Sequence, residues 1–340
     1  MDSYWNSTMR RDCEVVKETL QTYYLSVSYS LEFCVGFLGN LVVVLGYMLC
    51  LPQWQSFNIY LMNLAVSDLI FLCTLPRLAY LYANDQKESS PYACMVNRYI
   101  LHMNLYSSIL FMVWLSMDRF LLIKHPFRNH YLLRSRTALI VSGLTWLAVN
   151  VQVCPLIILM IQDQEYRNWS TCTDFASLKG QVNSLNYSLG LTLTGYVLPL
   201  IALCCFSYQI AHLLRVQETV VQQRGRSFKR PLRVVVSVAA MFFCLYTPYH
   251  VLRNVTIAYQ LSWPRPPLCT SVYTQVLYIL SRPLAFLHSV INPVFYFFMG
   301  DKFKELLSKN LRKLLRKTEQ QKNPSLDLQL KVACSIPNGD

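Results

Sequence analysis

Long runs of apolar residues recur along the whole 340-residue chain, separated by short polar segments. A helix that crosses the hydrocarbon core of a bilayer, about 30 Å thick, needs roughly 20 mostly apolar residues. Seven runs meet this length, and they cover residues 24–49, 57–82, 95–123, 137–161, 187–213, 233–259 and 270–298. Backbone groups inside lipid must be hydrogen-bonded within their own segment, so each run predicts a helix. The pattern therefore predicts an all-α integral membrane protein built as a seven-transmembrane helix bundle.

The seven runs also divide the chain into regions. Residues 1–23 form a polar N-terminus, and because MDSYWNSTMRRDCE offers no apolar core before a cleavage site, we expect no signal peptide. Residues 24–299 form the membrane domain. Residues 300–317 place leucines and Phe303 at helical spacing between lysines and arginines, which predicts a short amphipathic eighth helix on the membrane surface. Residues 318–340 are expected to form a flexible cytoplasmic tail.

Composition and charge agree with a membrane protein and set its orientation. The chain is 54% apolar and 14% charged, whereas soluble proteins carry roughly 25% charged residues. With the N-terminus outside, the cytoplasmic segments hold 20 of the 31 Lys and Arg residues and 7 of the 18 acids, so the whole net charge of +13 lies at that face. Basic residues are retained on the cytoplasmic side. The charge therefore reflects topology and contact with anionic membrane lipid, and it gives no reason to expect a nucleic-acid partner.

Two kinds of residue mark the extracellular segments. Sequons at Asn6 and Asn168 predict glycosylation, because both fall outside the membrane on that side. Four cysteines lie in an environment where disulfides persist. These are Cys13, Cys94, Cys172 and Cys269. Four cysteines permit three pairings, and spacing alone does not choose among them.

Seven short motifs occur in order along the predicted helices. They are Gly39-Asn40, Leu64-Ala65-Val66-Ser67-Asp68, Asp118-Arg119-Phe120, Trp146, Pro199, Pro248 and Asn292-Pro293-Val294-Phe295-Tyr296. Together they resemble the rhodopsin-like, class A G protein-coupled receptors over residues 20–317. The resemblance implies a receptor of the plasma membrane and not an enzyme. It also implies coupling to heterotrimeric G proteins, chiefly of the inhibitory class and also of the phospholipase-linked class, and a further partner in arrestin.

The resemblance assigns activation and G protein coupling to a set of residues in the inner halves of the helices. They are Asp118, Arg119, Tyr246, Pro248, Asn292, Pro293 and Tyr296. Asp118 is expected to pair with Arg119 until activation frees the arginine for the G protein. Proline removes a helix hydrogen bond, so the three prolines of helices 5 to 7 predict hinges. The sequence departs from the family at Tyr246, where a Trp is usual, and at Ser207, where a Tyr is usual.

A buried acid in the second predicted helix points to an ion site. Asp68 lies in mid-membrane, where a carboxylate is usually functional. The resemblance implies an allosteric sodium ion there, with Asn104 and Ser108 as further oxygen donors. His288 stands where the family usually has Asn. A purely structural, hydrogen-bonded Asp68 is the alternative.

Three arginines in the outer halves of the helices predict an anion site. Arg98, Arg253 and Arg282 are tolerated at that depth only if they face a water-filled cavity or a partner. Guanidinium groups match carboxylates bidentately. His102 lies one turn after Arg98 on the same helix face, and Tyr29 and Tyr82 can supply hydroxyls. Asp174 is the one well-placed acid and would lie over the pocket, so about two positive charges remain for a small dianion.

The segments around these arginines narrow the resemblance to the receptors for carboxylates and nucleotides. It implies recognition of extracellular succinate, or a related small dicarboxylate, by Arg98, His102, Arg253 and Arg282, aided by Tyr29 and Tyr82. It also implies disulfides Cys94–Cys172 and Cys13–Cys269. A receptor for 2-oxoglutarate or a nucleotide remains open, because those ligands also need clustered arginines. An opsin is excluded by Phe286 in place of a lysine, and an aminergic receptor by Leu101 in place of an Asp. An anion transporter is disfavoured because no inverted repeat is evident.

Overall fold

The computed structural model describes residues 14–51, 53–86, 88, 90–125, 130–166, 174–178, 183–220, 229–262 and 268–299. All regular structure in these residues is helical. Several predicted features lie outside them: the amphipathic helix at 300–317, the tail at 318–340, the sequons at Asn6 and Asn168, and Cys13 and Cys172. The side chain of Tyr296 is likewise outside the description, although its backbone is helical.

Seven helical crossings can be followed through the described residues. The first joins helical residues 14–19, the π-helix η1 (Leu20–Leu25) and α2 (Ser26–Cys50), and the second joins α3 (Ser56–Leu72) and α4 (Leu75–Ala83). The third is α5 (Pro91–Lys124), and after the short η2 (Tyr131–Leu133) the fourth is α6 (Ser135–Tyr166). After η3 (Phe175–Ser177), the fifth joins α7 (Asn183–Thr192), η4 (Leu193–Val197) and α8 (Leu198–Val220). The sixth is α9 (Lys229–Leu261), and the seventh joins α10 (Leu268–Phe286) and α11 (His288–Met299).

Five of these crossings are by themselves long and apolar enough to span a membrane. Within the described residues they are Glu14–Leu49, Ser56–Ala83, Pro91–Lys124, Ser135–Tyr166 and Asn183–Val216. Each coincides with one of the first five predicted runs and extends it at one or both ends. The sixth and seventh runs correspond to α9 and to the α10–α11 pair. The predicted seven-helix architecture is therefore confirmed.

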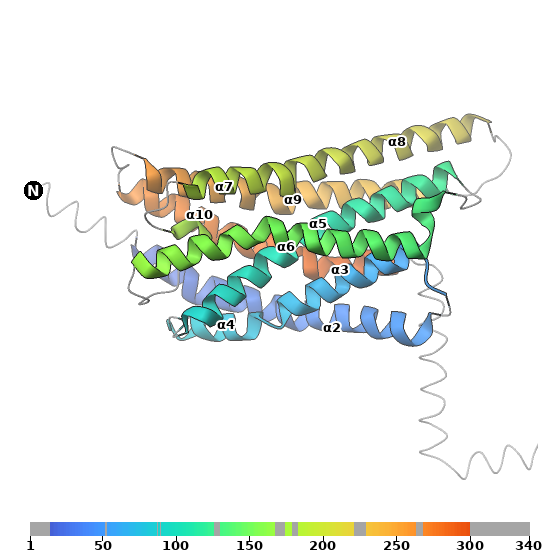
Figure 1. Cartoon of the computed structure of the whole chain (residues 1–340). Helices are drawn as coiled ribbons and strands as arrows, with labels where there is room; N and C mark the ends of the chain where they lie inside the picture. The colour runs from blue at the N-terminus through green and yellow to red at the C-terminus, as the bar shows by residue number, and fades with distance from the viewer. Residues whose placement is uncertain are drawn as a thin grey trace, which may run out of the picture.

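The third crossing lies at the centre of the bundle. Figure 1 shows the helices lying lengthwise beside one another, with α5 passing obliquely between its neighbours. In its most apolar stretch 72% of the α5 residues are buried, against 28–56% in the other four apolar crossings. We call the end at which α2 begins the outer end and the opposite end the inner end, following the predicted orientation. A residue on α5 can thus contact helices on several sides.

The outward faces of the other crossings are apolar. Large hydrophobic side chains project from α6 at Leu139, Ile140, Leu144, Leu147 and Val151, each 60–66% exposed. Monomeric soluble proteins rarely expose contiguous apolar patches of this kind. On a helix of a bundle they form the surface that contacts lipid tails.

Two crossings are interrupted where the hydrophobic pattern predicts one continuous helix. The second breaks at Cys73 and Thr74, where the Thr74 hydroxyl donates to the Phe71 carbonyl at 2.7 Å and Pro follows in the first turn of α4. The seventh breaks at Leu287, and His288 Nδ1 lies 2.6 Å from the Ala285 carbonyl. In both places a side chain bonds a carbonyl beside the break. Hydropathy alone does not reveal such local hydrogen bonds.

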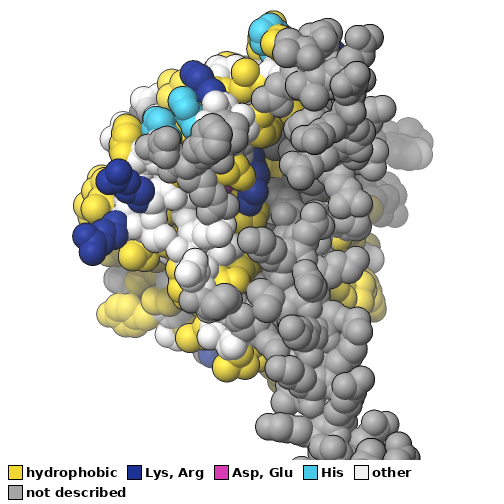
Figure 2. Space-filling model, turned by 90° about the vertical axis from the view of Figure 1, so that its right-hand side faces the viewer, with side chains coloured by type: hydrophobic (Ala, Val, Ile, Leu, Met, Phe, Trp, Pro, Cys, Tyr) yellow, Lys and Arg dark blue, Asp and Glu magenta, His cyan; other side chains and the backbone are white. Residues whose placement is uncertain are grey.

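Basic side chains gather at the inner end. Figure 2 views this end and shows Lys, Arg and His side chains distributed over the described part of the face. Four exposed cations there are Lys124, Arg134, Arg136 and Arg215. They belong to the segments whose charge predicted the orientation.

Candidate functional site

The carboxylate of Asp174 joins two helices at the outer end. Its Oδ1 lies 2.5 Å from Nη2 of Arg98 on α5, and its Oδ2 lies 2.7 Å from Nη1 of Arg282 on α10. Asp174 caps η3, and its backbone carbonyl accepts from the Ser177 amide at 2.8 Å. Burial raises the pKa of the Asp174 carboxyl, but Arg282 and Arg98 lower it further, so the pKa lies below its usual value. One anion is therefore shared by two cations at neutral pH.

Arg253 on α9 is fully buried and is held by neutral acceptors. Its Nε donates to the Ser188 hydroxyl at 3.0 Å, its Nη1 to the Tyr106 hydroxyl at 2.8 Å and its Nη2 to the Thr192 hydroxyl at 3.0 Å. Two aromatic rings flank the guanidinium with centroids 5.5 Å from Cζ, those of Phe175 and Tyr249. Among the described residues no carboxylate pairs with it. Its charge is oriented but not neutralised.

The other predicted ligand residues lie between and beside these arginines. His102 Nδ1 lies 2.8 Å from the Arg98 carbonyl, and its Nε2 lies 3.4 Å from the Tyr249 hydroxyl. Phe175 contacts the His102 ring edge-on at 5.7 Å and also flanks Arg253, so it connects the two halves of the cluster. Contacts through His102, Phe175 and Tyr249 thus connect Arg253 to the backbone of Arg98.

Tyr82 and Tyr29 complete the cluster around Arg282. The Tyr82 hydroxyl accepts from Arg282 Nη1 at 3.4 Å. The Tyr29 ring centroid lies 6.0 Å from Arg282 Cζ, and the buried Tyr29 hydroxyl has no hydrogen-bond partner among the described residues. Within the same part of the chain, Nη2 of Arg282 is also buried without a hydrogen-bond partner. The Tyr29 hydroxyl and Nη2 of Arg282 are therefore two donors that a ligand could use.

A second polar cluster surrounds Asp68 in the middle of the bundle. Its Oδ1 accepts from Asn104 at 2.9 Å, from Ser108 at 3.3 Å and from Ser289 at 2.9 Å. Its Oδ2 accepts from Asn292 at 2.8 Å. The Nε2 atom of His288 lies 3.6 Å from Oδ1. All these side chains are buried, so α3, α5 and α11 meet at one hydrogen-bonded carboxylate.

Tyr246 lies next to this cluster on α9. Its ring centroid is 5.2 Å from that of His288 and 5.0 Å from that of Phe242. The hydroxyl of Tyr246 is buried and finds no hydrogen-bond partner in the described ranges. Pro248 follows two residues later inside α9, and Arg253 lies five residues beyond it. One helix therefore carries Arg253, a proline and a ring next to the Asp68 cluster.

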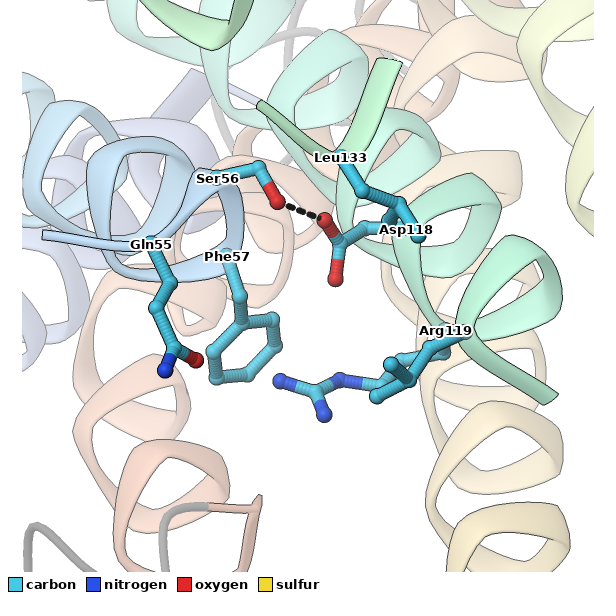
Figure 3. Close-up of a pocket in the computed structure, with 7 residues that line it drawn as sticks. Gln55, Ser56, Phe57, Asp118, Arg119 and Leu133 are labelled. Atoms are coloured by element: carbon cyan, nitrogen blue, oxygen red, sulfur yellow. Dashed lines mark hydrogen bonds between the residues drawn. The ribbon is translucent and has the colours of Figure 1, made fainter. Parts of the chain in front are cut away.

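At the inner end, two adjacent residues of α5 contact two adjacent residues of α3. The Ser56 hydroxyl donates to the Asp118 carboxylate. The Cζ atom of Arg119 lies 3.4 Å from the centroid of the Phe57 ring. Figure 3 shows the guanidinium turned toward this ring in a small pocket. Gln55, Ser56, Phe57, Asp118, Arg119, Leu122 and Leu133 line it. The pairing of Asp118 with Arg119 expected from the sequence stays a prediction.

Two of the four predicted extracellular cysteines can be placed. Cys94 and Cys269 are both disulfide-bonded. Because Cys13 and Cys172 lie outside the described residues, the pairings Cys94–Cys172 and Cys13–Cys269 also stay predictions.

Comparison with known proteins decides the family. A model of the 7 transmembrane receptor (rhodopsin family) matches residues 39–296, more than half of the chain. The chain belongs to this family. It is therefore a multi-pass membrane receptor and not an enzyme.

Two groups of receptors are among the similar proteins. The chain is 44% identical to "Succinate receptor 1" of Rattus norvegicus over 302 residues, 88% of this chain and 94% of the relative. It is also 44% identical to the protein of that name in Mus musculus over 298 residues, 87% of this chain and 93% of the relative. It is 30% identical to a purinoceptor of Cavia porcellus over 335 residues, 96% of this chain and 88% of the relative.

One residue of the cluster around Asp68 departs from the sodium site that the resemblance implied for this receptor. Protein donors make three hydrogen bonds to Oδ1 of Asp68 and one to Oδ2, and the buried Oδ1 of Asn104 has no hydrogen-bond partner among the described residues. A hard cation needs oxygen ligands, whereas His288 presents a ring nitrogen to Oδ1 of Asp68. The sodium ion stays a prediction from the resemblance, and we assign this receptor no step that depends on it.

Sequence reasoning missed several residues of the receptor's outer site. Glu32 on α2 is 5% exposed and lies close enough to Arg282 to interact with it electrostatically. A signal was present, because Glu32 is the one charged residue in the apolar run 24–49. The acceptors of Arg253, namely Tyr106, Ser188 and Thr192, carried no such signal. Hydroxyl side chains are common in membrane helices and most of them serve packing.

Proposed function

We propose that this receptor lies in the plasma membrane with its N-terminus outside and is activated by extracellular succinate. It signals through heterotrimeric G proteins, chiefly of the inhibitory class and also of the phospholipase-linked class. The observation that carries the ligand proposal is the imbalance of charge at the outer site. Three arginines are buried at the outer site, and among the described residues one carboxylate, that of Asp174, lies at ion-pair distance from two of them, Arg98 and Arg282.

A small dicarboxylate matches this imbalance. One ligand carboxylate would meet Arg253, which has neutral acceptors alone among the described residues, and the other would meet Nη2 of Arg282 and the Tyr29 hydroxyl. Charge-assisted hydrogen bonds of this kind are about twice as strong as neutral ones. The 44% identity to receptors named for succinate supports the same ligand.

The ligand would draw together three helices. Arg98, Arg253 and Arg282 lie on α5, α9 and α10, and each is at most 8% exposed. A dianion that binds them favours the arrangement in which they lie closest. Because Arg253 lies five residues beyond Pro248, a shift at Arg253 bends α9 at the proline and moves Tyr246 against His288. Ligand binding thereby shifts an equilibrium between two arrangements of the helices, and the change extends to the inner surface.

Some further features belong to the same proposal. Asn6 and Asn168 carry N-linked glycans, and Cys94–Cys172 and Cys13–Cys269 tie the outer segments together. Residues 300–317 form the amphipathic eighth helix, and residues 318–340 form the cytoplasmic tail that arrestin contacts. Glycosidase treatment and mass mapping of disulfide-linked peptides test the outer features directly.

A nucleotide receptor is the second candidate. The 30% identity to the purinoceptor of Cavia porcellus extends over 96% of the chain, and nucleotide phosphates also need clustered arginines. A receptor for 2-oxoglutarate is a third possibility within the same class of small anions. The ligand screen must therefore contain all three kinds of anion.

The test is a G protein activation screen on cells that express this chain, with succinate, 2-oxoglutarate, lactate and nucleotides. Succinate is expected to be the most potent, and Arg253→Ala and Arg282→Ala are expected to abolish its effect at normal surface expression. Arg77→Ala is the matched control, because the Arg77 side chain is 59% exposed and pairs with Glu88. A response to nucleotides alone would exclude the succinate assignment and leave the family unchanged.

A further inference from the structure

Arg119 is held by an aromatic ring at the inner end of the bundle. Its Cζ atom stands 3.4 Å from the centroid of Phe57, which is van der Waals contact between the guanidinium and the ring face. Cation–π contacts are counted out to about 6 Å, so this one is close. Figure 3 shows the long side chain of Arg119 reaching across the pocket toward α3.

The first turn of α3 contacts α5 near its inner end through two buried residues. Ser56 and Phe57 are 4% and 6% exposed, so neither moves freely. Ser56 binds Asp118 while Phe57 receives Arg119, and consecutive residues of one helix therefore fix consecutive residues of the other. Tyr47 of α2 lies close enough to interact electrostatically with Arg119. The Phe57 ring therefore contacts the guanidinium directly, and Tyr47 lies in its neighbourhood.

We propose that Phe57 is a positioning residue that holds Arg119 in the resting receptor, so that the guanidinium must leave the ring before it engages a G protein. The proposal rests on the coupling role proposed above for Arg119. Because the contact stabilises only the arrangement in which Arg119 lies against α3, its loss shifts the equilibrium toward the coupling-competent state. A cation–π contact is worth enough to change such an equilibrium roughly 2- to 30-fold.

The experiment measures basal nucleotide exchange in membranes, per receptor at the surface and without any agonist, on purified G proteins of the inhibitory and the phospholipase-linked class. Phe57→Leu keeps apolar bulk and removes the ring, and it is expected to raise basal exchange roughly 2- to 30-fold. Phe57→Trp keeps an aromatic face and is expected to leave basal exchange at the wild-type level. If Phe57→Leu reaches the surface poorly, Phe57→Met takes its place, since Met packs adaptably and has no ring.

Arg119 variants separate this proposal from the coupling role on which it rests. Arg119→Ala is expected to abolish exchange, and the double variant Phe57→Leu with Arg119→Ala is expected to lose the basal increase. Unchanged or reduced basal exchange in the Leu and Met variants, or the same increase in the Trp variant, overturns the role of Phe57 while the coupling role stands. Normal coupling by Arg119→Ala overturns both. A purely structural role of Phe57 would lower surface expression without raising basal exchange.

Discussion

Asp174 and Arg282 form an ion pair of 2.7 Å between the segment that follows α6 and helix α10. The same carboxylate reaches Arg98 on α5 at 2.5 Å. An internal carboxylate therefore occupies guanidinium groups that an anionic ligand would need. The charge of this cluster is neutralised in part by the protein itself, and the proposed anionic ligand would share or displace this carboxylate.

Asp174→Asn is expected to increase succinate potency. The change removes one negative charge that competes for Arg98 and Arg282 and keeps the size of the side chain. We expect the half-maximal succinate concentration to fall roughly three- to tenfold, where about 1.4 kcal/mol corresponds to tenfold. Dose–response curves for G protein activation measure this concentration. Glu88→Gln is the control, because it alters the ion pair between Glu88 and the exposed Arg77. A potency equal to or below that of the wild type would contradict the competition.

The Asp174 bridge is expected to be independent of pH in the physiological range. Its carboxyl pKa lies below the usual value of 3.8, so the bridge is present above that value and is lost only as pH falls through the lowered pKa. The ratio of succinate potencies of Asp174→Asn and wild type should then be the same at about pH 6 and about pH 8. Protonation of succinate changes the potency at both receptors by the same factor, so it does not alter the ratio. A ratio that changes with pH would show that another group controls the bridge.

The hydrophobic pattern was sufficient for the seven crossings but not for their ends and breaks. Helix α5 begins at Pro91, before the predicted residue 95, because Ser90 accepts a hydrogen bond from the Ala93 amide and Pro91 suits the first helical turn. This signal is in the sequence but is not a hydrophobic one. The breaks at Thr74 and Leu287 depend on side chains that bond nearby carbonyls, which no periodicity records.

The outer site was predictable where charge identified its residues. Arg98 and Arg282 share an acid that the sequence also indicated, because charged residues at membrane depth must find partners. Glu32 could have been found by the same rule. Tyr106 and Ser188 could not, because only the three-dimensional packing of α5 and α7 against α9 shows that their hydroxyls serve Arg253.

Gly195→Ala is expected to disturb the support of Arg253. A Cβ at Gly195 would clash with the ring of Tyr106, whose hydroxyl accepts from Arg253. Such overpacking costs about 1–3 kcal/mol, and relief requires that Tyr106 move. We expect a lower midpoint of thermal unfolding in detergent and weaker succinate activation. Gly190→Ala is the matched control in the same crossing, because nothing lies within 4 Å of its Cβ position.

The ring of His288 beside Asp68 predicts a receptor that is insensitive to sodium. His288 places a ring nitrogen 3.6 Å from Oδ1 of Asp68 at the position where the family usually has Asn, and three protein donors already bind that oxygen. A hard cation would lack the oxygen ligand that Asn supplies. Replacing NaCl by N-methylglucamine chloride at constant ionic strength should therefore leave agonist potency and the thermal midpoint of the wild type unchanged. A wild-type receptor whose thermal midpoint rises with sodium would show that the hydrogen bonds to Asp68 yield to the ion.

The variant His288→Asn is expected to create the sensitivity that the wild type lacks. It shortens the side chain, removes the ring nitrogen and offers an amide oxygen, which is a ligand that a hard cation accepts. The variant should gain a sodium-dependent rise in the thermal midpoint and a sodium-dependent loss of agonist potency. Asp68→Asn in the same background is the control, since it removes the charge that a cation needs, and the sodium effect should disappear with it.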